Sequence, residues 1–302
     1  MKKVILLILI SIIVFIEHDC LSNEDGNLKP LNSQIKQTEY NNYLSTVKLP
    51  DKLIFCGEKI PLEIPEVKER AEREFYMLLQ QPGQIILYLK RAGRYFPLFE
   101  EIIRELNMPN DLKYLAVAES ALYMARSPKN AYGLWQFMEG TGRKMGLIIN
   151  DYVDERCNPE KSTRAAMEYL AQGYRINKSW MLTAAGYNMG HSGVANSIDF
   201  QSVNDFFELF LNEETSRFIF RIAIIKEVME NAGKYGFNLA PEDIYKPEKG
   251  KIVRWTEAIP NLANWSSQQG TTYKEVKLLN PWIIKRELPS PPKGHVYEIL
   301  IH

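Results

Sequence analysis

A glutamate on the apolar face of a predicted helix is the first residue placed to do chemistry. A helix beginning at Asn110 or Asp111 puts Leu112, Leu115 and Glu119 on one face, because residues three, four and seven apart lie on the same side of an α-helix. Moving a carboxylate out of water is costly, so a buried glutamate has a raised pKa and stays protonated near neutral pH. A protonated carboxyl group is what general-acid catalysis requires.

The same local pattern also fits a structural glutamate. Ser120 and Ala121 follow directly, so Glu119 can stand at the helix end and reach solvent or cap a neighbouring helix. Spacing alone slightly favours this structural role, and the surrounding motifs have to decide.

Several motifs accompany the acid in a fixed order. They are Leu115-Ala116-Val117-Ala118-Glu119-Ser120, Ser127-Pro128, Gly133-Leu134-Trp135-Gln136-Phe137-Met138 with Thr141-Gly142-Arg143, Ala165-Ala166-Met167-Glu168-Tyr169-Leu170, and Gly186-Tyr187-Asn188-Met189-Gly190. Together these resemble the soluble-lytic-transglycosylase (SLT) domain, closest to the membrane-bound lytic murein transglycosylase D group. The resemblance covers residues 95–198 well and the flanking helices loosely. It makes Glu119 the expected catalytic acid.

The resemblance implies a mainly α, lysozyme-like fold of the goose-type lysozyme/SLT kind. It also implies cleavage of the β-1,4 bond between N-acetylmuramic acid (MurNAc) and N-acetylglucosamine (GlcNAc), with a 1,6-anhydro product. Most glycosidases use two carboxylates, whereas here Glu119 would protonate the leaving oxygen and then accept the proton of the sugar's own C6 hydroxyl. Intramolecular attack gains from a high effective molarity, so no second carboxylate is needed.

The motif positions imply a set of supporting residues around the acid. Ser120 and Ser127 would donate hydrogen bonds to Glu119 or to the sugar. Gln136 would line the cleft, and Met138 would pack near the acid.

The Gly186 to Gly190 motif supplies two more expected site residues. Tyr187 would hold the carboxyl group, and Asn188 would bind the substrate N-acetyl group. On local chemistry alone, Tyr187 also fits a helix-packing aromatic and Asn188 a C-terminal cap. Trp135 and Phe137 are interpreted as core residues and not as sugar platforms.

Three positions depart from the family pattern. The interval from Glu119 to Ser127 is one residue shorter than the commonest family spacing, which leaves the reach of Ser127 to the acid open. Glu139 stands where a proline is usual, and this carboxylate would raise the pKa of Glu119 if it were close enough. Gly186 stands where an alanine is usual. Residues 154–156 (Asp-Glu-Arg) also match the group, but we interpret them as a structural loop held by an arginine–carboxylate pair.

These residues have to be positioned by a helical body. From Glu66 to about Tyr235, apolar residues recur at helical spacing, beginning with Val67, Ala71 and Phe75. We expect a helical lead-in over residues 66–94 and the SLT catalytic domain over residues 95–240.

The C-terminal residues 241–302 have a different pattern, typical of a small α+β module. Predicted strands at 252–255 and 296–301 bracket two short helices near Leu262 and Val276. This arrangement resembles a degenerate LysM repeat, a module that binds GlcNAc-containing glycans. The usual Gly-Asp-Thr step is missing and residues 282–294 form a Pro-rich insertion, so glycan binding and a purely structural role both stay open.

The N-terminus predicts export. Met1-Lys2-Lys3 and the apolar run from Val4 to Ile16 are typical of a signal peptide over residues 1–19. The run is shorter than the roughly 20 apolar residues that span a bilayer. Residues 20–65 are expected to form a flexible tether. Cys20 stands where a lipoprotein carries its lipid, although Glu17-His18-Asp19 is unusual before such a site. The prediction is therefore an exported, periplasmic cell-envelope protein, with a lipid anchor and membrane association left open.

Composition excludes other classes. The 302 residues include 37 Lys+Arg and 37 Asp+Glu, so the formal net charge is +0 and no basic excess favours nucleic acid as a partner. Cys56 and Cys157 are the only cysteines besides Cys20, too few for a disulfide framework, and neither has the sequence context of a catalytic nucleophile. No metal or cofactor is predicted, and the expected partner is the peptidoglycan glycan strand. The oligomeric state is not predicted.

Two alternatives to the lytic transglycosylase stay open. A hydrolytic muramidase or chitinase on the same fold would use water in place of the C6 hydroxyl. A non-catalytic peptidoglycan-binding protein would keep the cleft but would not need Glu119 on an apolar face.

Overall fold

The structure is a computed structural model, which describes residue 39 and residues 42–302. Residues 47–302 form one compact unit, to which the following description applies. The predicted signal peptide and Cys20 lie outside the described residues. Within the described part of the chain, no helix is both long enough and apolar enough to cross a membrane.

A short hairpin of β1 (Ile54–Phe55) and β2 (Glu58–Lys59) lies inside the range predicted to be a tether. Its two-residue turn has positive φ at both positions, 51° at Cys56 and 85° at Gly57, as the turns that match strand twist require. The flanking apolar side chains are fully buried: Leu53, Phe55 and Ile60. The predicted flexible tether therefore does not extend through this segment, because the apolar side chains of the hairpin enter the core.

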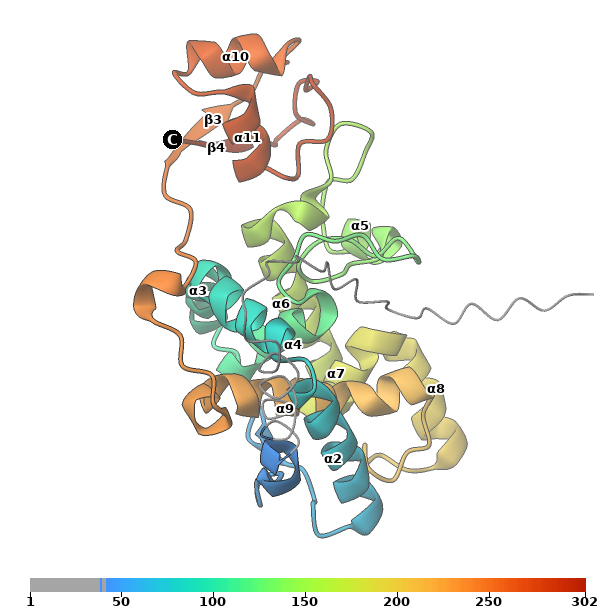
Figure 1. Ribbon diagram of the computed structural model, residues 1–302. Helices are drawn as coiled ribbons and strands as arrows, with labels where there is room; N and C mark the ends of the chain where they lie inside the picture. Colours follow the sequence, from blue (N-terminus) through green and yellow to red (C-terminus); the bar gives the residue numbers. More distant parts are fainter. Residues whose placement is uncertain (1–38, 40–41) are drawn as a thin grey trace, which may run out of the picture. The chain divides into compact units, whose positions relative to one another are not determined.

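The helical body consists of long helices joined by short connections (Figure 1). Its α-helices are α2 (Pro65–Leu79), α3 (Pro82–Glu105), α4 (Lys113–Ser120), α5 (Glu139–Lys144), α6 (Pro159–Asn177), α7 (Trp180–Met189), α8 (His191–Gln201) and α9 (Glu213–Glu230). Four short 3-10 turns are described with them: Asn110–Leu112, Glu155–Cys157, Ala232–Tyr235 and Pro241–Asp243.

Helix α9 is the centre of this body. It packs against α2, α4 and α7, and α6 packs against α7 and α3. A helix that is apolar around most of its circumference must be buried, and α9 buries residues on nearly every side, including Phe218, Ile219, Phe220 and Ile222. The helix that carries Glu119, α4, therefore lies against the central element of the fold.

The C-terminal module is a two-stranded antiparallel sheet with two short helices, as predicted (Figure 1). Strand β3 (Lys251–Trp255) pairs with β4 (Tyr297–Ile301), and α10 (Leu262–Gln268) and α11 (Tyr273–Leu279) lie between them in the chain. Alternate residues of β4 are buried, as expected for a strand with one face on a core.

The module shares its core with the helical body. Val153 and Cys157, from the loop before α6, belong to the same buried cluster as Trp282 and Ile283. Two backbone hydrogen bonds join the same segments: Asp154 N donates to Trp282 O (2.9 Å), and Ile284 N donates to Tyr152 O (2.8 Å). The module therefore has a structural role in holding residues 152–157.

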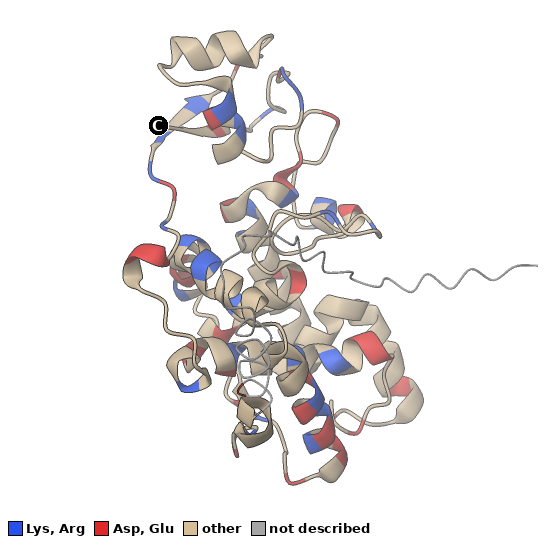
Figure 2. Ribbon diagram, in the orientation of Figure 1, with Lys and Arg blue, Asp and Glu red and all other residues tan. Residues whose placement is uncertain are grey.

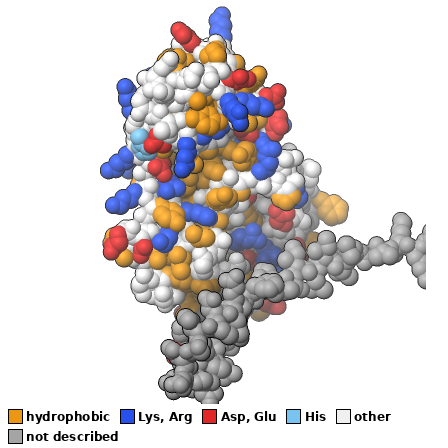
Figure 3. Space-filling view, turned by 45° about the horizontal axis from the view of Figure 1, so that its top comes forward, with side chains coloured by type: hydrophobic (Ala, Val, Ile, Leu, Met, Phe, Trp, Pro, Cys, Tyr) orange, Lys and Arg blue, Asp and Glu red, His pale blue; other side chains and the backbone are white. Residues whose placement is uncertain are grey.

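Charges of both signs are interspersed over the helices (Figure 2). One face of the molecule likewise shows hydrophobic, basic and acidic side chains next to one another (Figure 3). This mixture agrees with the formal net charge of +0.

Candidate active site

Glu119 lies in the last turn of α4, on the stripe that the sequence predicts. Leu112, Leu115 and Ala116 are completely buried, and a 3-10 turn over Asn110–Leu112 leads into the helix where its start is expected. The helix ends because Ala121 adopts the left-handed conformation (φ 54°) and donates its N–H to Val117 O (2.9 Å). The chain then leaves the helix axis directly after the acid.

A cleft of about 690 Å³ opens next to Glu119. Its lining contains six of the seven predicted site residues: Glu119, Ser127, Gln136, Met138, Tyr187 and Asn188. Residues from α6 and α9 complete it, among them Tyr169, Glu214, Phe218 and Arg221. Motifs separated by up to 69 positions in the sequence, from Glu119 to Asn188, therefore meet in one cavity.

The environment of Glu119 suits a general acid. Burial raises the pKa of its carboxyl group to about 8, the nearby Arg221 cation partly opposes this shift, and Glu214 adds to it. The side chain is half-buried, with part of its surface open to the cleft. The carboxyl group makes no hydrogen bond or ion pair with the described residues, so little compensates its lost hydration. A substantial protonated fraction therefore persists at neutral pH.

Ser120 does not face the cleft. Its hydroxyl donates to Leu134 O (2.7 Å) and Ala116 O (3.1 Å), and it is not among the lining residues. The expected contact of Ser120 with Glu119 or the sugar is therefore replaced by a structural one, because the left-handed turn after α4 brings the Gly133 to Met138 segment over its hydroxyl.

One wall of the cleft, which we call the loop wall, consists of residues 121–138. Gln136 has positive φ (48°), and its Nε2 donates to Ala125 O (2.9 Å) and Gly133 O (2.7 Å). Ser127 Oγ accepts from Ala131 N (3.0 Å) instead of bonding to Glu119. Both side chains line the cleft and also hold the shape of the wall.

Arg156 supports the loop wall from behind. Its guanidinium forms a two-point pair with Asp154 (2.9 and 2.6 Å) and donates to the carbonyl oxygens of Asn130 (2.9 Å) and Phe137 (3.1 Å). Both Arg156 and Asp154 are buried. The interpretation of residues 154–156 as a structural loop with an arginine–carboxylate pair is confirmed.

Gly133 allows the loop wall and the Arg156 backbone to approach. Its φ is +86°, and a Cβ at this position would lie 1.9 Å from Arg156 O. Only glycine fits both the conformation and the space.

Tyr187 and Asn188 reach the cleft from the end of α7. The Tyr187 hydroxyl donates to Trp135 O (2.7 Å) and not to the acid, and burial, followed by the nearby Glu119 charge, raises the pKa of Tyr187 well above its usual range. Asn188 Oδ1 accepts from the Thr215 hydroxyl (2.7 Å), which fixes its amide against α9. Trp135 is fully buried and Phe137 nearly so, as expected for core residues.

His191 explains the unusual glycine before Tyr187. Its ring packs against that of Tyr169 in a tilted arrangement (4.4 Å between centroids, 38° between planes), and Nε2 lies 3.1 Å from Tyr169 O. A Cβ on Gly186 would lie 2.3 Å from His191 Nδ1, and one on Gly173 would lie 2.2 Å from the same ring. An alanine at position 186 therefore has no room while the His191 ring fills the space beside Gly173 and Gly186.

The opposite wall of the cleft, which we call the helix wall, is one face of α9. Glu214, Phe218 and Arg221 line it at intervals of four and three residues. These three residues were not predicted as site residues. Their spacing places them on one face of a helix, but nothing in the sequence says that this face meets the cleft. Glu214 forms an exposed ion pair with Lys129 of the loop wall (3.7 Å).

Glu139 does not act on the acid as anticipated. Its carboxylate pairs with Arg143 one turn along α5 (2.9 Å), and both side chains are exposed. The carboxylate that raises the pKa of Glu119 is Glu214.

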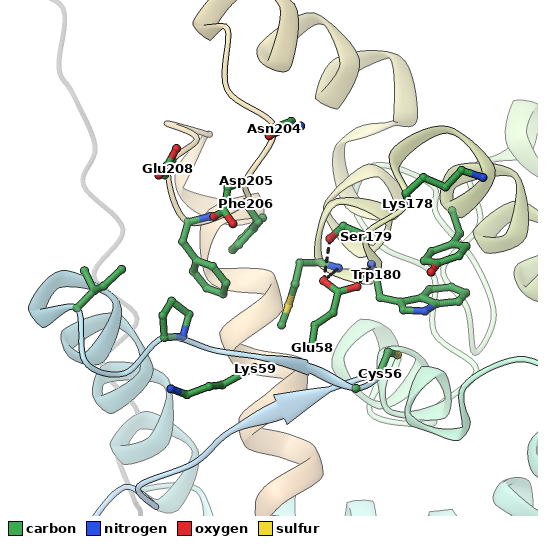
Figure 4. Close-up of a pocket in the computed structure, with 16 residues that line it drawn as sticks. Cys56, Glu58, Lys59, Lys178, Ser179, Trp180, Asn204, Asp205, Phe206 and Glu208 are labelled. Atoms are coloured by element: carbon green, nitrogen blue, oxygen red, sulfur yellow. Dashed lines mark hydrogen bonds between the residues drawn. The ribbon is translucent and has the colours of Figure 1, made fainter.

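A second hollow of about 730 Å³ lies at the other end of α7 (Figure 4). None of the predicted site residues lines it. Glu58 caps α7 there, accepting from Ser179 Oγ (2.8 Å) and from Trp180 N, and Tyr174 stacks on Trp180 (4.1 Å). These contacts join the β1–β2 hairpin to α7 and give the four side chains a structural role.

Two family models match parts of this chain. Residues 98–209 match the transglycosylase SLT domain, and residues 251–301 match the soluble lytic transglycosylase C-terminal LysM-like domain. The chain therefore contains a transglycosylase SLT domain and a LysM-like C-terminal domain. The predicted resemblance is confirmed, and with it the predicted fold class, a lysozyme-like helical domain with a LysM-like module. All seven predicted site residues lie inside the SLT match, whereas Glu214, Phe218 and Arg221 lie beyond its end.

Two curated relatives are similar over most of this chain. Membrane-bound lytic murein transglycosylase D of Escherichia coli (strain K12) and its counterpart in Escherichia coli O6:H1 are each 30% identical over 240 residues, which is 76% of this chain and 51% of the relative. The chain therefore spans about half the length of the curated relatives it matches.

Proposed function

We propose that this protein, with its SLT domain, is an exported peptidoglycan lytic transglycosylase that cleaves the MurNAc–GlcNAc β-1,4 bond and forms 1,6-anhydro-MurNAc. The observation that carries the proposal is a single half-buried carboxyl group, Glu119, whose pKa is raised to about 8 beside a cleft of about 690 Å³. A cavity of this size suits a few sugar rings.

In the proposed reaction, protonated Glu119 donates its proton to the glycosidic oxygen as the bond from C1 to that oxygen breaks. The resulting carboxylate stabilises the positive charge that develops at C1. It then accepts the proton of the C6 hydroxyl while the C6 oxygen bonds to C1, which regenerates the acid. No water enters the products, so protons and electrons balance within the substrate.

The raised pKa supports both halves of this cycle. At neutral pH much of the carboxyl group is protonated and ready to donate, and after donation the poorly hydrated carboxylate is a stronger base than an exposed glutamate. Tyr187 keeps its proton because its own pKa is raised, so it positions Trp135 O without competing as an acid.

The remaining lining residues are proposed to bind the substrate. Asn188 has its oxygen fixed by Thr215, which leaves the amide N–H groups for a substrate carbonyl such as that of an N-acetyl group. Met138 is 47% exposed at the cleft and offers an apolar contact to a sugar face. Gln136 and Ser127 shape the loop wall, and the role of Ser120 is structural.

Hydrolysis is the second candidate, because another carboxylate is present in the lining. Glu214 is such a group, and a water-activating base in an inverting glycosidase stands on the opposite side of the bond from the acid. Its exposure (66%) and its ion pair with Lys129 favour a solvated side chain that is not built into the reaction centre.

Product analysis separates the two reactions. Purified peptidoglycan is digested with the wild type, Glu119→Gln and Glu214→Gln, and the soluble muropeptides are weighed by mass spectrometry. The lyase gives anhydro products, lighter than the hydrolysis products by one water, from the wild type and Glu214→Gln but not from Glu119→Gln. Reducing-end products that depend on Glu214 would instead establish a hydrolase, and binding without any product would establish a glycan-binding protein.

Export and the domain division remain part of the proposal. The signal peptide (1–19) and the start of the tether lie outside the described residues, and the lead-in (66–94), catalytic domain (95–240) and C-terminal module (241–302) keep their proposed limits. The relatives are named as membrane-bound proteins, which supports a cell-envelope location. Cell fractionation of the full chain, with metabolic lipid labelling of the wild type and Cys20→Ala, tests location and anchoring together.

A further inference from the structure

A smaller hollow adjoins the active-site cleft. It measures about 250 Å³ and is lined by residues of α2, α3, α4 and α9: Glu74, Met77, Leu78, Gln81, Tyr88, Ala118, Arg217, Arg221, Ile224 and Ile225. Two of these, Ala118 and Arg221, also line the cleft. Ala118, one residue before Glu119, and Arg221, on the helix wall, therefore border both spaces.

Arg221 makes only one long ion pair, to the buried carboxylate of Glu74, among the described residues. Its Nε lies 3.7 Å from Glu74 Oε2, whereas Arg217 Nε lies 2.5 Å from Glu74 Oε1. Arg217 thus satisfies most of the Glu74 charge, and this carboxylate is only 6% exposed. Arg221 is 39% exposed, and its guanidinium has five N–H donors. The 3.7 Å contact is its only ion pair among the described residues, so several donors are available to a ligand.

The ion-paired group around Glu74 has a surplus of positive charge. It joins the guanidinium groups of Arg73, Arg217 and Arg221 to the carboxylates of Glu74 and Glu213, three cations to two anions. Arg73 pairs with Glu213, and Arg217 pairs with both Glu74 and Glu213. Of the three arginines in this group, Arg221 is the one that lines the cleft. Its charge acts on groups in both spaces, since it opposes the rise in pKa that burial causes at Glu119 in the cleft and at Tyr88 in the smaller hollow.

A muramyl glycan carries carboxylates that a glycan of GlcNAc alone lacks. Peptide-free MurNAc ends its lactyl group in a carboxylate, and peptide-bearing MurNAc carries carboxylates on its stem. Guanidinium groups bind carboxylates through two parallel N–H···O bonds, a geometry that neutral sugars cannot reproduce.

We propose that Arg221 and the hollow beside Ala118 form a carboxylate-binding subsite that recognises the anionic group of a muramyl residue near the scissile bond. This proposal rests on the proposed function, because it names how the same cleft distinguishes its substrate. A carboxylate bound at Arg221 also offsets the cation that opposes protonation of Glu119, so an anionic substrate favours the acid form of the catalyst. Tyr88 and Gln81 supply polar groups to the same hollow.

The test measures binding without turnover. Glu119→Gln serves as the reference, and Arg221→Gln is added to it. Calorimetry then compares three glycans of equal length: peptide-free GlcNAc–MurNAc strands, the same strands with stem peptides, and neutral GlcNAc oligomers. Arg175→Gln is the matched control, because Arg175 forms an exposed pair with Glu168 and does not line either hollow.

Loss of one charged two-point contact should weaken binding of an anionic glycan about 10-fold or more and leave the neutral oligomer unchanged. A loss confined to peptide-free strands identifies the lactyl carboxylate, and a loss confined to peptide-bearing strands identifies the stem. Equal loss for the neutral oligomer, or no loss for any glycan, overturns the proposal.

A second variant guards against a folding artefact. Arg221→Lys keeps the charge but lacks the planar fork, so it should retain part of the preference for anionic over neutral glycans, and the retained part should fall with added salt. If both variants lose the preference equally while keeping the melting temperature of the Glu119→Gln reference, the result supports a site that requires the planar guanidinium of arginine. If Arg221→Lys binds like the reference at every salt concentration, two-point recognition is overturned. Since these measurements use variants without turnover, a wild type that forms no anhydro product would refute the proposed function and leave the binding result standing.

Discussion

The two walls of the cleft are built in different ways. The loop wall, residues 121–138, is fixed by side chains that bond to backbone: Gln136, Ser127 and, from behind, Arg156. The helix wall is a face of α9 that presents charged side chains to the cavity, with Arg221 39% and Glu214 66% exposed. The loop wall lies inside the SLT match and the helix wall lies outside it. We therefore propose that the loop wall holds the reaction geometry, whereas the helix wall sets the charge of the cleft and the choice of substrate.

The strongest test of this comparison removes the acid that both walls enclose. Glu119→Gln should lower the rate of anhydro product formation by about 10³-fold or more, since in the proposed mechanism Glu119 performs both proton transfers and each such transfer contributes roughly 10²–10⁴-fold. The matched control is Glu139→Gln, whose carboxylate pairs with Arg143 outside the cleft and should leave the rate unchanged. Product formation by Glu119→Gln at the wild-type rate would contradict the mechanism.

Breaking the support of the loop wall should cost stability as well as activity. Arg156→Gln leaves the buried Asp154 carboxylate without its partner and frees two carbonyl groups of the wall, so we expect a loss of about 3–5 kcal/mol in the free energy of unfolding. Urea denaturation measures it. Arg143→Gln, at an exposed pair, is the control and should change stability by less than about 1 kcal/mol. Equal effects of the two variants would show that the wall does not depend on Arg156.

The close approach of Gly186 to the His191 ring offers a double-mutant test. Gly186→Ala places a methyl group 2.3 Å from His191 and should destabilise the fold by about 1–3 kcal/mol. Adding His191→Ala should recover part of that loss, because the ring that fills this space is gone. Unfolding of the two single variants, the double variant and the wild type gives the coupling free energy. Additive effects would exclude the proposed steric pairing.

The raised pKa of Glu119 makes a signed prediction about pH. In the unfolded chain this carboxyl group has its ordinary pKa of 4.5, and burial raises the pKa to about 8 in the folded chain. Between these values the folded state binds the extra proton, so Glu119 makes the protein less stable as pH rises from about 4.5 to 8. Glu119→Gln should therefore gain stability relative to the wild type as pH increases through this window. A difference in melting temperature that stays constant with pH would contradict the assigned pKa.

The smallest expected effect concerns the charge on the helix wall. Glu214→Gln removes an anion that raises the pKa of Glu119, so the alkaline limb of the pH–rate profile should move slightly to lower pH. The maximal rate should stay within about twofold, because Glu214 has no proposed role in proton transfer. A large loss of rate would instead assign Glu214 to the reaction and favour hydrolysis.

Local patterns predicted a large part of this molecule. The apolar stripe that carries Glu119 is buried as its spacing requires. The two C-terminal strands pair with each other, and two short helices lie between them in the chain, as the sequence pattern predicts. The β1–β2 hairpin was missed because each strand has only two residues, too few for a periodic signal. The direction of the Ser120 hydroxyl could not be predicted, since it depends on a left-handed turn that brings Leu134 O within reach.

The sequence by itself pointed to Glu119 as the candidate acid and to the helix that carries it, because helical periodicity and the order of motifs are properties of neighbours in the chain. Tertiary structure alone decided what surrounds that acid. Arg221 and Glu214 come from a helix that begins 94 positions after Glu119, and only the packing of α4 against α9 brings their charges to it. Burial and electrostatic fields act through space, so the raised pKa and the proposed carboxylate subsite become visible only when the chain is folded.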